Sequence, residues 1–72
     1  MTNPWGLQPH ECDALALLIE YGTDKAACRQ LGVAPGTFGS RVKSARRKMK
    51  ANSRVRAAVE WDRWARAHRM EA

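Results

Sequence analysis

The spacing of apolar residues predicts four helices and no strands. The sharpest pattern lies in residues 35–49, where Phe38, Val42, Ala45 and Met49 recur at intervals of four, three and four residues. These intervals place the four side chains on one face of a helix, so they predict a buried stripe with a polar face opposite.

Two shorter helices are predicted ahead of this segment. Residues 9–21 form the first, because Pro9 suits an opening turn and Gly22 suits the position after the last turn. Residues 24–31 form the second, because the hydroxyl of Thr23 can cap its N-terminus.

Residues 53–68 form the fourth predicted helix, which carries two apolar rows. The first row contains Ala57, Ala58, Trp61, Trp64 and Ala65, and the second begins with Val55 and Val59. A helix that is apolar on two sides usually meets two surfaces. We therefore expect Val55, Val59 and Trp64 to contact a second copy of the chain.

Residues 1–7 carry Pro4 and Gly6 and predict an extended N-terminal arm, with Trp5 and Leu7 folding back onto the core. The whole chain has 72 residues, which is enough for one small core and no more. The sequence therefore predicts a single domain over residues 1–72, an all-α bundle of four helices.

The charge distribution favours a polyanionic partner. The chain has 13 Lys and Arg against 7 Asp and Glu, for a net charge of +6. Residues 1–33 hold two of these cations and four of the anions, whereas residues 34–72 hold eleven cations and three anions. Such an asymmetry inside one domain is typical of proteins that bind nucleic acid.

Several classes of function are disfavoured. No nucleophile with a base, carboxylate pair or glycine-rich phosphate loop can be assembled, so we expect neither an enzyme nor a cofactor. The residues Cys12, Cys28, His10 and His68 lack the spacing of a metal site.

The longest apolar run, residues 14–19, is too short to cross a bilayer, and no signal peptide is recognisable. We expect a cytoplasmic protein of a bacterium or a phage-infected host cell, with both cysteines reduced.

Residues 23–49 have the layout of a helix-turn-helix. Two predicted helices are joined by the tight turn of residues 32–34, and the second helix is apolar on one face and basic on the other. The apolar stripe would hold this helix on the domain while its polar face enters a major groove, which is about 12 Å wide.

Residues 7–61 resemble the LuxR/FixJ/GerE-type DNA-binding domain. Leu7 and Glu11 match the family's Leu-Thr-x-Arg-Glu opening, and residues 23–28 match its Ser-Asn-Lys-Glu-Ile-Ala segment. Residues 33–38 then stand in the turn and at the start of the third helix, and the register holds without a gap.

The resemblance implies that the third helix enters the groove and the fourth mediates dimer contacts. The positions expected to face the bases are Gly39, Ser40, Lys43 and Arg47. Those expected to hold the DNA backbone are Lys25, Thr37, Arg46, Lys50 and Arg54. Gly39 stands where the family usually has lysine and offers no side chain, so we expect Lys43 and Arg47, with Ser40 or Arg46, to read the sequence.

The sequence thus predicts a sequence-specific regulator of transcription that binds double-stranded DNA as a homodimer. Family members commonly carry a sensing domain ahead of this module, whereas few residues precede the first helix here, so we expect either a stand-alone regulator or one domain taken from a longer protein. Two alternatives stay open. One is a phage-type accessory protein for DNA processing or packaging, and the other is a protein-interaction module whose basic face binds an acidic partner such as RNA polymerase.

Overall fold

The computed structural model describes residues 3–69 of the chain. Its elements are α1 (Pro9–Tyr21), α2 (Asp24–Leu31), α3 (Pro35–Met49) and α4 (Arg54–Arg69). The described residues contain no strand, so the predicted all-α fold of four helices is confirmed. The first three helices have the expected bounds, whereas α4 begins and ends one residue later than expected.

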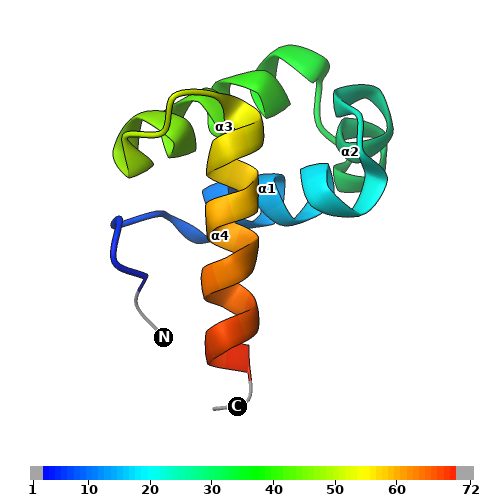
Figure 1. The fold of residues 1–72 in the computed structure, drawn as a ribbon. Coiled ribbons are helices and arrows are strands. Elements are labelled where there is room, and N and C mark those ends of the chain that lie inside the picture. The colour runs from blue at the N-terminus through cyan, green and yellow to red at the C-terminus, as the bar shows by residue number, and fades with distance from the viewer. Residues whose placement is uncertain (1–2, 70–72) are drawn as a thin grey trace.

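Helices α1 and α3 form the centre of the arrangement, because each of them packs against all three other helices. Figure 1 shows α3 lying across one end of the molecule, with α4 beginning beside α3 and running away from it. Within the described residues α2 and α4 do not pack directly on each other. One face of α3 is therefore covered by the other helices, and its opposite face points away from the domain.

The predicted stripe of α3 forms the centre of the core. Phe38, Val42, Ala45 and Met49 are all buried, and Phe38 and Ala45 have no exposed surface. The other helices contribute a set of mostly small buried side chains, namely Ala14, Leu15, Ala27, Cys28, Ala57 and Ala58. Small side chains let the helices approach closely, so the larger groups of α3 are surrounded on all sides.

The N-terminal arm departs from the extended conformation that we expected. Residues 3–7 form a turn closed by the buried side chain of Asn3, whose Oδ1 accepts from the backbone N–H of Trp5 at 3.1 Å and of Leu7 at 2.8 Å. Its Nδ2 donates to the carbonyl of Leu7 at 3.1 Å. Leu7 thereby enters the core and Trp5 packs against it, as expected. Residues 1 and 2 lie outside the described residues.

A buried carboxylate joins α1 to α3. Glu11 is 2% exposed, and its carboxylate accepts hydrogen bonds from Ser44 Oγ at 2.6 Å and Lys48 Nζ at 2.8 Å. The backbone N–H of Gln8 also donates to it, at 2.8 Å, which caps the start of α1. Sequence analysis had given Glu11 only as a match to the family's opening motif and had not identified its partners on α3.

The surroundings of Glu11 keep it ionised. Burial by itself raises the pKa of this carboxyl, but the hydrogen bonds from Lys48, Ser44 and Gln8, with the charge of Lys48, outweigh burial and lower the pKa to about 2. The group is therefore negatively charged wherever the protein is folded near neutral pH.

None of the helices in the described part of the chain is both long enough and apolar enough to cross a membrane.

The lowered pKa of Glu11 predicts a loss of stability in acid. Its folded pKa lies below the unfolded value, so its contribution is complete above pH 4.5 and is lost as the pH falls toward 2. We expect wild type to lose about 2 kcal/mol more than Glu11→Gln between about pH 6 and about pH 3. Urea unfolding at the two pH values measures this difference.

The matched control is Glu20→Gln, which removes an exposed carboxyl from the same helix. That variant should show the acid sensitivity of wild type. If Glu11→Gln also loses as much stability as wild type, the ionised Glu11 does not hold α1 to α3.

Candidate nucleic-acid interface

Helices α2 and α3 are joined by a turn that the backbone closes on itself. Gly32 has a φ of 77°, and its N–H donates to the carbonyl of Cys28 at 2.9 Å. The N–H of Val33 donates to the same carbonyl at 3.1 Å, and the Val33 side chain packs against the core. The expected turn is therefore present, with its apolar residue facing inward.

The outward face of α3 carries a row of exposed polar residues. Ser40, Lys43 and Arg47 are all exposed, and their spacing of three and four residues places them on the side of α3 opposite the buried stripe. The structure thus brings three of the four expected base-facing residues together. Gly39 is half-buried and lies on the flank of α3 instead.

The cations of this face are free of internal partners. The ion pairs among the described residues are Lys48–Glu11, Arg54–Asp24, Arg56–Glu60 and Arg66–Asp62. None of them includes Lys43, Arg47 or Lys50, all of which are exposed. An anion that approaches α3 from outside therefore meets positive charge that no carboxylate of the described chain offsets.

The residues expected to hold the DNA backbone lie in different settings. Lys25 in the first turn of α2 and Thr37 in the first turn of α3 are exposed. Lys50 lies directly after the last turn of α3. Arg46 and Arg54 are half-buried and already hold partners within the chain.

Arg46 of α3 and Arg54 of α4 are each anchored by a partner within the chain. Arg46 Nη1 donates to the carbonyl of Ala51 at 3.2 Å, and Arg54 Nη2 donates to the carboxylate of Asp24. The second contact links α4 to α2, which do not pack directly. Both arginines also line a hollow of about 410 Å³. The residues that line this α3–α4 hollow are Gly39, Val42, Lys43, Arg46, Ser53 and Arg54.

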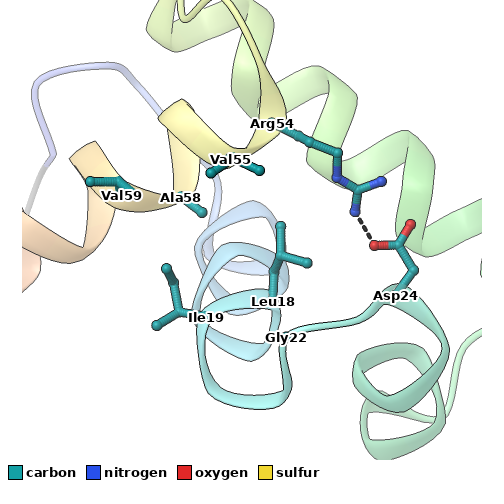
Figure 2. A pocket seen from close by; sticks show the side chains of 8 residues that line it. All are labelled: Leu18, Ile19, Gly22, Asp24, Arg54, Val55, Ala58 and Val59. Atoms are coloured by element: carbon teal, nitrogen blue, oxygen red, sulfur yellow. Dashed lines mark hydrogen bonds and ion pairs between the residues drawn. The ribbon is translucent and has the colours of Figure 1, made fainter.

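An apolar hollow lies on another side of α4. Figure 2 shows Val55, Ala58 and Val59 of α4 facing Leu18 and Ile19 of α1. Val55 is 67% exposed, and Val59 and Ile19 are each 39% exposed. The hollow has a volume of about 330 Å³, and the Asp24–Arg54 ion pair lies at its edge. We call it the α1–α4 hollow.

Trp64 does not join Val55 and Val59. It packs edge-on against Trp5 with ring centroids 5.9 Å apart, and it stacks on His68 at 4.6 Å. Trp64 lies nine positions after Val55, which corresponds to two and a half turns of an α-helix, so the two side chains leave opposite sides of α4. The three expected dimer residues therefore belong to two separate surfaces.

Within residues 3–69, no group of three or more His, Cys, Asp or Glu side chains is arranged to hold a metal ion. Cys12 and Cys28 are free thiols, and burial is the main cause that raises the pKa of Cys12.

No family model, curated protein or solved structure matches this chain. The LuxR-type resemblance therefore stays a prediction from the motif, and the function is argued below from the geometry.

Lys50 occupies a strained backbone position. It follows the last turn of α3 and has a φ of 55°. No other non-glycine residue in the part of the chain that the structure describes has a positive φ. Lys50→Gly should raise the free energy of unfolding by about 0.5–1 kcal/mol, because glycine adopts this conformation freely. Lys43→Gly is the matched control and should lower it by about 1 kcal/mol, since Lys43 lies inside the helix. Urea unfolding at neutral pH measures both, and a loss of stability in Lys50→Gly would contradict the strain.

Proposed function

We propose that this protein is a sequence-specific regulator of transcription that places α3 in the major groove of double-stranded DNA. The observation that carries the proposal is the row of Ser40, Lys43 and Arg47, exposed opposite a buried apolar stripe. The buried stripe and the hydrogen bonds from Ser44 and Lys48 to Glu11 together hold α3 in one orientation, so the same three side chains point outward. A helix held in this way presents a constant pattern of donors to the groove.

The chemistry of this row suits base edges. Lysine and arginine donate to O6 and N7 of guanine, and a serine hydroxyl can donate or accept. We assign sequence reading to Ser40, Lys43 and Arg47. Gly39 contributes no side chain, and its half-buried position on the flank agrees with a smaller part in base contact.

The residues assigned to the DNA backbone are spread over the ends and flank of α3. Thr37 lies in its first turn and Lys50 directly after its last, so the two are separated by almost the full 15-residue helix of about 22 Å. That separation suits contacts with the two strands that border a groove. Lys50 keeps its positive charge at a position where glycine would be less strained, which supports a role for its side chain. Lys25 and the anchored pair Arg46 and Arg54 complete the assigned set.

We further propose that two copies of the chain bind a pseudo-palindromic site through the α1–α4 hollow. Val55, Val59 and Ile19 form its exposed apolar part. One wall of the hollow belongs to α1 and the other to α4. A two-fold axis would set these exposed apolar side chains against the same side chains of a second copy, and that contact would cover them. Trp64 already packs within its own chain, so we place the contact on the two valines.

Base recognition by α3 depends on individual side chains, which can be removed one at a time. After the preferred duplex is selected from a random pool, Arg47→Ala should bind it about 5–100-fold more weakly, because a side-chain contact to a base is worth about 1–3 kcal/mol. Lys43→Ala should lose preference at a different base pair. Fluorescence anisotropy against single-base variants measures both effects.

Arg66→Ala is the matched control, because it removes the same charge from an exposed position near the far end of α4. At the same salt concentration, its affinity for the selected duplex should lie within about 2-fold of that of wild type. If affinity does not fall with rising salt, the electrostatic mechanism is wrong. Co-purification of an acidic protein such as RNA polymerase after nuclease treatment, without binding to any duplex, would favour the interaction module.

A substitution in the α1–α4 hollow tests the proposed assembly. Val55→Asp should leave the fold intact, since Val55 is largely exposed, and should weaken binding to a two-half-site duplex by more than about 10-fold. Binding to a single half-site should change little. Analytical ultracentrifugation of wild type with its duplex should report two chains per site. A ring of many subunits would contradict the two-fold arrangement and favour the packaging accessory.

A further inference from the structure

The α3–α4 hollow is lined by positive charge from two helices. Lys43 and Arg46 come from α3 and Arg54 from α4, and the hydroxyl-bearing Ser53 lies beside Arg54. None of the six lining residues is acidic. The α1–α4 hollow differs in this respect, because Asp24 and four large apolar side chains line it. An anion is therefore the class of ligand that suits the α3–α4 hollow.

Each of the two arginines that line this hollow already has a partner within the chain. One nitrogen of Arg46 is bound to the carbonyl of Ala51, and one nitrogen of Arg54 is bound to Asp24. A guanidinium has five N–H donors, so each arginine keeps donors for a further acceptor. An arginine that is already ordered loses less side-chain entropy on binding than a free surface arginine does.

The mouth of the hollow is open on the side of α3. Gly39 forms part of its lining, and a Cβ atom added there would meet no neighbouring atom within 4 Å. A long side chain at this position would project into that open space. The glycine therefore leaves room for a group that approaches along the flank of α3.

We propose that the α3–α4 hollow holds one phosphate group of the DNA backbone and thereby sets the position of α3 along the groove. This inference rests on the proposed function and adds to it a single site for Lys43, Arg46, Ser53 and Arg54. Arginine suits such a site because its planar fork can bind two phosphate oxygens at once. Lys43 lines the hollow and also belongs to the outward face of α3, so it lies between the proposed phosphate position and the proposed position of the bases.

The test neutralises phosphates one at a time. Duplexes of the selected sequence are made with a single methylphosphonate at each position, and their affinities for wild type and Arg46→Gln are compared. For wild type, one position in each half-site should cost more than about 5-fold in affinity. For Arg46→Gln, a methylphosphonate at that position should lower the affinity by less than about 2-fold, because this variant has already lost its contact with the phosphate.

Two further variants keep this test decisive. Arg66→Gln removes an exposed arginine of α4 and should respond to every methylphosphonate as wild type does. Gly39→Glu places a carboxylate at the mouth of the α3–α4 hollow without removing any cation. In this variant, the methylphosphonate at the sensitive position should no longer lower the affinity. Arg46→Gln should lower the slope of log affinity against log salt by about 1.

The outcomes separate this inference from the proposed function. If wild type binds no duplex, the proposed function itself is wrong. If wild type binds but Arg46→Gln keeps the full sensitivity at every phosphate, the function stands and the phosphate site is wrong. Titration of the free protein with inorganic phosphate, followed by amide chemical shifts, should show no saturation below about 1 mM, and tight saturation would assign the hollow to a free anion instead.

Discussion

The contact between α1 and α3 decides which residues the protein can present to a partner. Apolar burial of Phe38, Val42, Ala45 and Met49 holds α3 on the domain, but hydrophobic packing has little directional preference. The hydrogen bonds from Ser44 and Lys48 to the buried carboxylate of Glu11 are directional. They prevent α3 from rotating about its axis, and any rotation would replace the outward row by a different set of side chains.

The protein keeps its positive charges in three settings. Lys48, Arg54, Arg56 and Arg66 are paired with carboxylates and add less to the field outside the molecule. Lys43, Arg47 and Lys50 have no such partner within residues 3–69. Arg46 is intermediate, because one of its nitrogens is bound to a backbone carbonyl and the others keep donors for further contacts. The net charge of the chain is thus less informative than the places where that charge stays unpaired.

Local signals predicted the helices well because each depends on neighbouring residues. The glycines after α1 and α2, the Thr23 cap and the periodic stripe of α3 all act within a few positions of the chain. Ser53 lies just outside α4 for the same kind of reason, since its Oγ accepts from the N–H of Arg56 at 3.1 Å. A capping residue precedes the helix that it caps.

The contacts that sequence analysis missed join distant positions. Glu11 contacts Ser44 and Lys48, which lie 33 and 37 positions later in the chain, and no local pattern reveals such contacts. A signal was nevertheless present, because Glu11 shares the helical face of buried Ala14 and Leu15. The separation of Trp64 from Val55 also follows from helical spacing, whereas the turn formed by Asn3 has no periodic signal.

Arg54 has a consequence that extends beyond its own contacts. Its side chain lines both the apolar hollow between α1 and α4 and the basic hollow between α3 and α4, and Asp24 restrains it between them. A molecule that displaces or orders this guanidinium on one side changes the charge and shape offered on the other. Thermodynamic linkage makes such an influence mutual, so the proposed self-association and the proposed phosphate binding would each affect the other through Arg54.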